Sequence, residues 1–510
     1  MTMTHPGLPF EWLLLAITLM VLGVLWAMFR LPVVYLAKPY INIERIPLLG
    51  SLARLFAASP WPLLFLRFIA VALFLMVIAA GLFGTPVPEH NLATTLTWTI
   101  WWTGLIITVF FLGSAWCAVC PWDAIAGWLV RRRLWRRSDQ SASLGLRVPK
   151  AWRNVWPALI MFAGLTWLEL GVGVTTNPYA TAVLSLVMVV LATVYMAVFE
   201  RKAFCKHVCP VGRTVGFYAQ LSMVELRPRQ QQTCDDCETL ECYHGSKQIE
   251  PCPTNLVMGR LTQSTYCTSC AACTMSCPHD NVGWRLRSPA IEAIRHARPH
   301  WDEAWFMVGL LALTSFHGIT MMGFWEKGLS DFARVIGDSG QLLWSFSLGM
   351  LIVFIVPAVL YTVIIRMTQG MLPVAIPFKQ LFAKLAFISL PLAFVYHIAH
   401  NLNHLVRESR GFTEVLMNPL GRDTLPYSSH EIHMRHMQPL LNEQLLFALQ
   451  AGLMVLGFWL AVQVLKKRTL DALGESQQWR AVYLFPGFVF IVVVTAFNLW
   501  LLAQPMVMRM

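Results

Sequence analysis

Long apolar stretches recur along the whole chain and are separated by shorter polar segments. Each stretch has about 20 residues, the length at which a helix crosses the hydrocarbon core of a bilayer. The stretches lie at residues 10–29, 62–84, 96–116, 155–174, 179–199, 304–325, 343–366, 384–405, 444–465 and 481–503. They are too long and too uniformly apolar for barrel strands. The pattern predicts an all-α integral membrane protein with about ten transmembrane helices.

The composition agrees with this pattern. Of the 510 residues, 56% are hydrophobic and 13% are charged, whereas about 25% of the residues of a soluble domain are charged. A disordered chain is excluded, and a soluble multi-domain protein is disfavoured. The first apolar stretch has no basic segment before it and no small-residue cleavage site, so we expect it to be retained and not removed as a signal peptide.

The basic residues alternate from loop to loop. Of the 39 Lys and Arg residues, 31 lie in every second segment between the apolar stretches. These segments are 30–61, 117–154, 200–303, 366–384 and 466–480. The positive-inside rule puts them in the cytoplasm of a prokaryotic cell and puts both termini outside. The net charge of +12 therefore arises mostly from the cytoplasmic segments, and no nucleic-acid partner is expected. The basic run 131–137 is interpreted as an anchor for lipid headgroups.

The organisation that follows has three parts. Residues 1–200 form a five-span region, residues 201–303 form a cytoplasmic ferredoxin-like insertion, and residues 304–510 form a second five-span region. All twelve cysteines fall on the predicted cytoplasmic side. Thiols in that compartment stay reduced and suit metal or redox chemistry.

The most specific motif is Cys267-x2-Cys270-x2-Cys273-x3-Cys277-Pro278. This is the bacterial ferredoxin spacing, in which three thiolates bind one [4Fe–4S] cluster and the fourth binds a second cluster. A looser run precedes it, with cysteines at 234, 237, 242 and 252 and again a final Cys-Pro. The crossed arrangement predicts that Cys234, Cys237, Cys242 and Cys277 hold one cluster, and that Cys252, Cys267, Cys270 and Cys273 hold the other. A single cluster beside a zinc site is the alternative.

Four cysteines remain, in two Cys-Pro motifs at the ends of apolar stretches. They are Cys117 and Cys120 before Pro121, and Cys205 and Cys209 before Pro210. If the two motifs meet at the membrane surface, their four thiolates can hold a third cluster. A redox-active dithiol and simple packing are the alternatives.

These motifs resemble the membrane polyferredoxin family, which includes NosR and NapH and the FixG, RdxA and CcoG proteins. The resemblance covers roughly residues 60–290. It implies electron transfer through the membrane between quinols or partner proteins and metal centres, in some members linked to copper reduction. The chain departs from the family in its C-x2-C-P motif, where members have C-x3-C-P. It also lacks a NosR-type flavin domain and the C-terminal immunoglobulin-like domain of the oxidase-assembly members.

Histidines and one carboxylate lie within the apolar stretches, where ionisable groups are costly. His317 lies in the sixth stretch, and His397, His400 and His404 share one face of the eighth. Imidazoles from two spans are what a bis-His haem b needs, so we predict His317 with His397 or His400 as its ligands; polar packing is the alternative. Glu169 in the fourth stretch is a candidate to accept a proton from a quinol.

The loop at 406–442 contains a further His/Met segment. Its candidate ligands for Cu(I) are His430, His433, Met434, His436 and Met437. The sequence hypothesis is therefore a membrane electron-transfer protein of the prokaryotic cytoplasmic (inner) membrane. It has lipid around it, two to three [4Fe–4S] clusters, haem b, and a quinone or a redox protein as partner. A copper reductase or assembly factor using the outer loop, a scaffold without turnover and a solute transporter are the alternatives; the direction of electron flow and the oligomeric state are left open.

Overall fold

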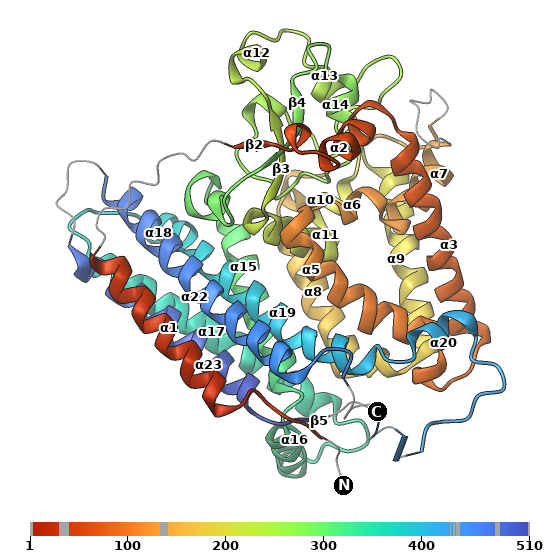
Figure 1. Ribbon diagram of the computed structural model, residues 1–510, viewed down its shortest axis with the longest axis vertical. Coiled ribbons are helices and arrows are strands. Elements are labelled where there is room, and N and C mark those ends of the chain that lie inside the picture. The colour runs from red at the N-terminus through yellow and green to blue at the C-terminus, as the bar shows by residue number, and fades with distance from the viewer. Residues whose placement is uncertain are drawn as a thin grey trace.

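The computed structural model describes residues 4–29, 40–132, 141–428, 430–431, 434, 439–474 and 480–507. The protein is mostly helical and carries a small sheet at one end (Figure 1). One group of helices comes from the first part of the chain: α3 (Trp61–Phe83), α4 (Leu92–Thr94), the π-helical stretch Thr95–Trp101, α5 (Trp102–Leu112), α8 (Trp156–Leu170) and α9 (Pro178–Val198). Local signals set their ends. The side chain of Asn177 accepts a hydrogen bond from Ala180 N at 3.0 Å and begins α9, and Gly84 ends α3.

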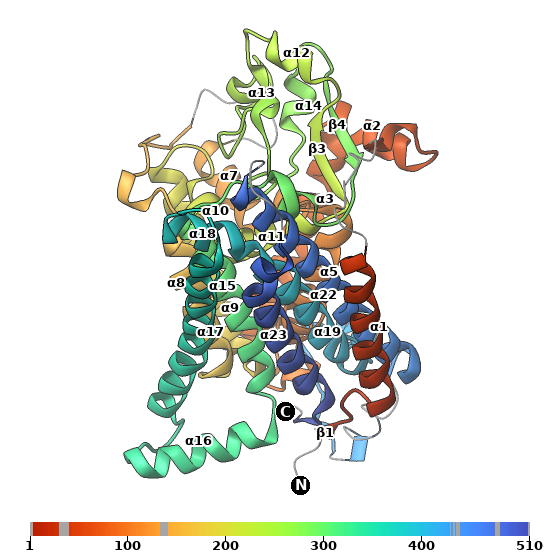
Figure 2. The same ribbon diagram turned by 90° about the vertical axis from the view of Figure 1, so that its left-hand side faces the viewer.

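The second group of helices comes from the last part of the chain and from its beginning. It comprises α1 (Phe10–Phe29), α15 (Trp301–Ile319), α16 (Gly323–Ile336), α17 (Leu343–Met371), α18 (Phe378–Leu385), α19 (Ser389–Glu408), α20 (Phe412–Met417), α22 (Glu443–Leu473) and α23 (Phe485–Ala503). Helix α1 packs against α22 and α23. The two ends of the chain are joined by the antiparallel pair β1 (Thr4–His5) and β5 (Met506–Val507), and both lie away from the larger sheet (Figure 2).

Seven helical segments within the described residues are long and apolar enough to cross a membrane. They are Trp61–Phe83, Leu92–Leu112, Pro178–Val198, Leu343–Met371, Phe378–Glu408, Glu443–Leu473 and Ala481–Ala503. The protein is therefore a multi-pass membrane protein. The three other apolar stretches of the sequence are also helical, as α1, α8 and α15, but α8 is only 15 residues long. It ends before Gly171 and Gly173, and Gly173 adopts the left-handed conformation with φ +77°.

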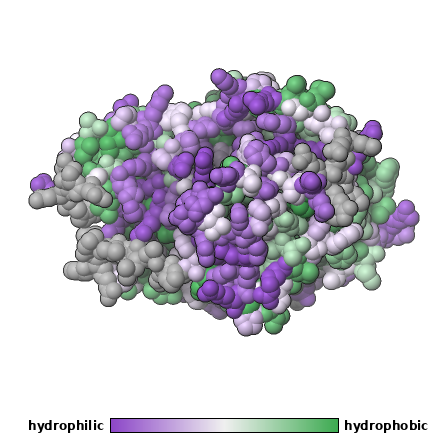
Figure 3. All heavy atoms as spheres, turned by 90° about the horizontal axis from the view of Figure 1, so that it is seen from above, coloured by the Kyte–Doolittle hydropathy of each residue, from purple (hydrophilic) through white to green (hydrophobic). Residues whose placement is uncertain are grey.

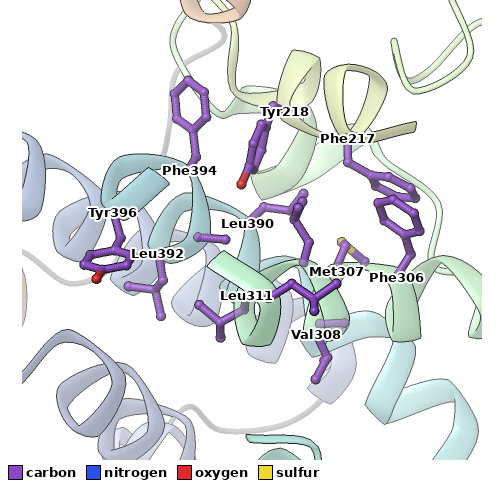
Figure 4. Close-up of a cluster of buried hydrophobic side chains, with 14 of the residues drawn as sticks. Phe217, Tyr218, Phe306, Met307, Val308, Leu311, Leu390, Leu392, Phe394 and Tyr396 are labelled. Atoms are coloured by element: carbon purple, nitrogen blue, oxygen red, sulfur yellow. The ribbon is translucent and has the colours of Figure 1, made fainter. Parts of the chain in front are cut away.

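Helix α19 is the central element of the second group. Within the most apolar part of the segment Phe378–Glu408, which contains α19, 94% of the residues are buried inside the protein. The corresponding share is 22% for α3 and for α17. Its side chains Leu390, Leu392 and Phe394 pack with residues of α15 and of the short helix α11 (Pro210–Tyr218) (Figure 4). Polar residues on α19 therefore face protein, where they can find partners, and not lipid.

The sheet lies at the end of the molecule that carries most of the cysteines. Strands β2 (Ile41–Asn42), β4 (Val282–Leu286) and β3 (Val224–Pro228) are antiparallel in that order, with Ile41 and Val224 both opposite Leu286. Around it lie α2 (Leu49–Ala58), α12 (Gln231–Asp235), α13 (Glu241–His244) and α14 (Ala272–Ser276). Residues 41–58, which precede the first helix group, thus join the cysteine-bearing region. Seen from that end, the surface is largely polar (Figure 3).

Candidate functional site: three sets of four thiols

The first set of thiols occupies the loops between β3 and β4. Cys234, Cys237, Cys242 and Cys277 line one small pocket. Asn281 donates its backbone N–H to Cys277 Sγ and its side-chain amide to Cys234 Sγ, both at 3.4 Å. Gly259 is needed here because a Cβ at that position would lie 2.7 Å from Cys234 Cβ. The structure thus brings Cys277 to the upstream cysteines, as the crossed arrangement requires.

The second set contains the other three cysteines of the ferredoxin motif and Cys252. Burial raises the pKa of the Cys273 thiol well above its usual value, and neighbouring Cys270, Cys267 and Cys252 raise it further in that order. Burial likewise raises the pKa of Cys267 to about 11. Backbone N–H groups point at two of the sulfurs: Leu256 N lies 3.3 Å from Cys252 Sγ, and Ser269 N lies 3.4 Å from Cys267 Sγ.

The third set forms where the two Cys-Pro motifs meet. Each motif ends one short helix and begins another: α6 (Trp116–Val119) and α7 (Pro121–Arg131) in the first, and α10 (Ala203–His207) and α11 in the second. Proline at the first position of α7 and of α11 fixes these breaks. Cys120, Cys205 and Cys209 line one pocket. Cys117 lies close to Cys205, whose charge raises the pKa of Cys117, after burial, to about 12.

Burial makes these thiols poor thiolates on their own. It raises the pKa of Cys120 and of Cys205 to about 12 as well. A thiolate in such a place needs a positive partner, which the iron of a cluster supplies. The donor sets fit the group: there are three sets of four thiols, and the twelve cysteines are all free. No group of three or more His, Cys, Asp or Glu side chains in the described segments is placed to hold a metal ion; the thiolates of a cluster bind different irons and stand further apart than the ligands of one ion.

Hydrogen bonds join the third set to the second. Arg201 Nη1 donates to Cys252 O at 2.8 Å, and Lys202 N donates to Pro253 O at 3.0 Å. Arg213 bridges Cys205 O at 3.0 Å and Thr265 O at 3.1 Å. These bonds hold the loops of the two sets against each other.

A buried ion pair lies beside the third set. Lys202 Nζ is 2.6 Å from Asp123 Oδ2, and each side chain is 8% exposed. Burial opposes ionisation of both groups, but their mutual attraction outweighs it, so the pKa of Asp123 is lowered and that of Lys202 is raised. We did not single out this pair from the sequence, although both residues stand three positions from a predicted ligand.

The histidines of the second helix group do not all point the same way. His317 and His400 meet edge to face with ring centroids 5.3 Å apart, and His404 follows His400 at 5.1 Å. His397 instead lies on the side of α11, with its Nδ1 3.2 Å from the Tyr218 hydroxyl. No sequence signal pointed to Tyr218, because only packing brings α11 to α19 (Figure 4).

A cleft lies at the end of the helices opposite the sheet. Glu169, His317 and His404 line it together with Trp98 and Trp102. Glu169 Oε1 is 3.8 Å from His317 Nδ1. The sequence candidate for proton transfer and one of the candidate histidines are thus neighbours.

Only part of the predicted outer His/Met segment is described. His430 and Met434 are exposed. His433, His436 and Met437 lie outside the described residues. A copper site there stays a prediction.

Comparison with known proteins supports the interpretation of the cysteines. The sequence family described as "4Fe-4S binding domain" matches residues 94–138 and 181–222, which contain both Cys-Pro motifs. The protein named "Putative electron transport protein YccM" of Escherichia coli (strain K12) is 29% identical over 151 residues, covering 29% of this chain and 40% of that protein. The methylamine utilization ferredoxin-type protein MauN of Paracoccus denitrificans (strain Pd 1222) is 29% identical over 154 residues, covering 26% of this chain and 50% of that protein.

The chain thus spans half or less of the length of these curated relatives. No solved structure matches it. The two stretches matched by the 4Fe-4S family hold the four cysteines of the third thiol set, and the names of the two relatives refer to electron transport and to a ferredoxin-type protein. The matched part of the chain is accordingly similar to membrane polyferredoxin-like 4Fe–4S proteins.

Proposed function

We propose that this chain carries electrons across the prokaryotic cytoplasmic (inner) membrane, between a quinol/quinone site on the outer side and three [4Fe–4S] clusters on the cytoplasmic side. The observation that carries the proposal is the arrangement of twelve free cysteines in three sets of four. The second and third sets are linked through hydrogen bonds of Arg201 and Arg213. When bound, such clusters accept and donate single electrons.

The proposed topology has ten spans, both termini outside and the sheet region in the cytoplasm. The five-span regions 1–200 and 304–510 flank the insertion 201–303. The distribution of Lys and Arg supports this orientation. So does the β1–β5 pair, which holds both chain ends at the end of the molecule away from the sheet (Figure 2).

The cleft lined by Glu169, His317 and His404, which this topology puts on the outer side of the membrane and which we call the outer cleft, is a candidate site for quinol oxidation. Oxidation of a quinol releases two electrons and two protons, so the site needs bases beside the two hydroxyl groups. Glu169 and His317 are adjacent bases in the cleft, and Trp98 and Trp102 provide aromatic walls for a ring. In this proposal the protons pass to Glu169 and His317, and the electrons pass to the clusters.

Residues of the two helix groups connect this cleft with the third thiol set. Trp102 lines the cleft and lies 5.7 Å from the ring of His397. His397 contacts Tyr218, and Tyr218 ends the helix that begins after Cys209. This row of buried and partly buried aromatic and imidazole rings supports transfer between the cleft and the membrane end of the thiol sets.

The predicted haem b meets a geometric difficulty. The sequence predicted His317 with His397 or His400 as its ligands. The rings of His317 and His400 contact each other edge to face, and His397 lies against the Tyr218 hydroxyl. Axial ligation needs the macrocycle between the two imidazoles, so the described arrangement does not fit a haem. The haem stays a prediction that a pyridine haemochrome spectrum tests, and no step depends on it.

The central test is the cofactor content of the purified protein. We expect about twelve irons and twelve acid-labile sulfides per chain, with EPR signals of three reduced [4Fe–4S] clusters. Fewer than about eight irons would overturn even the two-cluster core.

One observation favours the second candidate function, a copper reductase or metal-centre assembly factor. His404 Nε2 lies 3.0 Å from Met321 Sδ at the outer cleft, and imidazole with thioether is a donor set that suits Cu(I). Copper in the purified protein at one ion per chain, lost in a Met321→Leu variant, would support this function over a pure electron relay.

A further inference from the structure

A second cleft, which the proposed electron path does not use, lies on the side of the thiol sets. Its volume is about 540 Å³, within the range of small-molecule sites. Three segments far apart in the sequence form it: the stretch 147–153, the stretch 200–207 around α10, and residues 300–303 at the start of α15. Tyr243 and Tyr266 add two aromatic rings to its wall.

The cleft carries an excess of positive charge. We call it the basic cleft, after five cations that line it: Arg147, Arg153, Arg201, Lys202 and Lys206. Three acidic residues also line it: Glu200, Asp302 and Glu303. The cations therefore outnumber the acids.

Two of the three acidic side chains accept hydrogen bonds from uncharged groups of the protein. Asp302 Oδ2 accepts the Val155 backbone N–H at 3.0 Å, and Glu303 Oε1 accepts the Tyr266 hydroxyl at 2.7 Å. These bonds hold the two carboxylates in fixed positions without a cation. Among the cations, Lys202 pairs with Asp123, which is not part of the lining.

Three other cations of the cleft donate hydrogen bonds to neutral carbonyls, and two of them, Arg201 and Lys206, also lie over the rings of Tyr243 and Tyr266. Arg201 donates to Cys252 O at 2.8 Å, Lys206 donates to Thr254 O at 3.1 Å, and Arg153 donates to Val148 O at 2.6 Å. Each bond to a carbonyl uses one donor of the cation and neutralises no charge, while an Arg side chain has five N–H donors and a Lys side chain has three. Donors and charge remain for a ligand.

We propose that the basic cleft binds the phosphate group of an anionic ligand, either a soluble nucleotide or an anionic phospholipid headgroup. Guanidinium and ammonium groups together are the usual partners of phosphate oxygens. Basic pockets beside membrane helices also take lipid headgroups. Because Arg201 bonds the carbonyl of Cys252, and Lys202 lies beside Cys205, the ligand would place its negative charge next to the second and third thiol sets.

Binding to the purified holoprotein in an uncharged detergent tests the proposal. Isothermal titration with ADP and inorganic pyrophosphate, against adenosine as the matched ligand without phosphate, probes the soluble source. Native mass spectrometry after exposure to phosphatidylglycerol or phosphatidylcholine probes the lipid source. The variants are Arg147→Gln and Lys206→Gln, and the control is Lys150→Gln, an exposed cation outside the lining.

The two sources give different results. If the ligand is a nucleotide, ADP binds and adenosine does not, and each lining variant weakens ADP about tenfold or more because a charged hydrogen bond is lost. If the ligand is a lipid, phosphatidylglycerol is retained over phosphatidylcholine, and the lining variants lose it. The proposal is overturned if neither phosphate source binds, if adenosine binds as well as ADP, or if the lining variants behave like Lys150→Gln. Iron content, measured in parallel, keeps this result separate from the proposed electron transfer.

Discussion

The Tyr218 hydroxyl lies 3.2 Å from Nδ1 of His397, and both side chains are buried. Tyr218 stands at the end of α11, which begins directly after Cys209, whereas His397 belongs to the central helix α19. This contact joins the cysteine-bearing helices to the histidine-bearing helices. Removing the single hydroxyl oxygen of this contact should therefore slow electron transfer between the two parts of the proposed path.

Replacing Tyr218 by Phe removes that hydroxyl and keeps the ring. We expect a loss of stability of about 1–3 kcal/mol, because the buried imidazole loses its partner, and slower reduction of the clusters by quinol. Tyr361→Phe is the matched control, since the buried Tyr361 hydroxyl donates to Phe382 O at 2.7 Å, between two helices that carry no cysteine. Denaturant unfolding and stopped-flow absorbance measure the two effects. Equal rates in the two variants would exclude a role for Tyr218 in transfer.

The crossed arrangement of the ferredoxin cysteines predicts which substitutions share a phenotype. Cys277→Ser should remove the same EPR signal as Cys237→Ser, because both line one pocket. Cys252→Ser should remove the signal that Cys270→Ser removes. If Cys277→Ser instead matches Cys270→Ser, each cysteine run holds its own cluster and the crossed arrangement is wrong.

The Lys202–Asp123 pair should tune the cluster of the third thiol set. Lys202→Met removes a positive charge and should lower the midpoint potential, because the oxidised, less negative cluster is then favoured. Asp123→Asn should raise the potential. Each change leaves a buried charge unpaired and should cost about 3–5 kcal/mol of stability.

A redox titration followed by EPR measures these potentials, with Lys150→Met as the exposed control. The opposite signs matter, because a general loss of packing would shift both variants in the same direction. Shifts of the same sign would show that the pair acts only through folding.

Glu169→Gln should slow the reduction of the clusters by quinol without changing their reduction by dithionite. A positioned base contributes about a hundredfold or more to proton transfer, and the amide cannot accept the proton. Glu326→Gln on α16, which does not line the outer cleft, is the control. Unchanged quinol kinetics in Glu169→Gln would remove the carboxylate from the proposed site.

Much of this protein could be predicted from local patterns. Lengths of apolar sequence indicated the helices, and the spacing of Cys267, Cys270 and Cys273 indicated a cluster, because one short loop fixes how its thiols converge. The family match supports [4Fe–4S] binding in the part of the chain that carries the two Cys-Pro motifs, residues 94–138 and 181–222, whereas the cluster at Cys267, Cys270 and Cys273 stays a prediction. The structure also assembles the two Cys-Pro motifs, which the sequence could only mark as similar. The helix lengths did not follow from apolar length alone: the apolar stretch 155–174 predicted a full span, but α8 ends at Leu170, before Gly171.

The sequence by itself determined a helical membrane protein with iron–sulfur chemistry, because hydropathy and cysteine spacing act within one segment of chain. Only the tertiary structure decided that His317 meets His400 while His397 meets Tyr218. It alone also placed the cations of the basic cleft together and paired Lys202 with Asp123. These contacts join segments that are up to hundreds of residues apart, and their geometry follows from how the helices pack around α19, which no local pattern encodes.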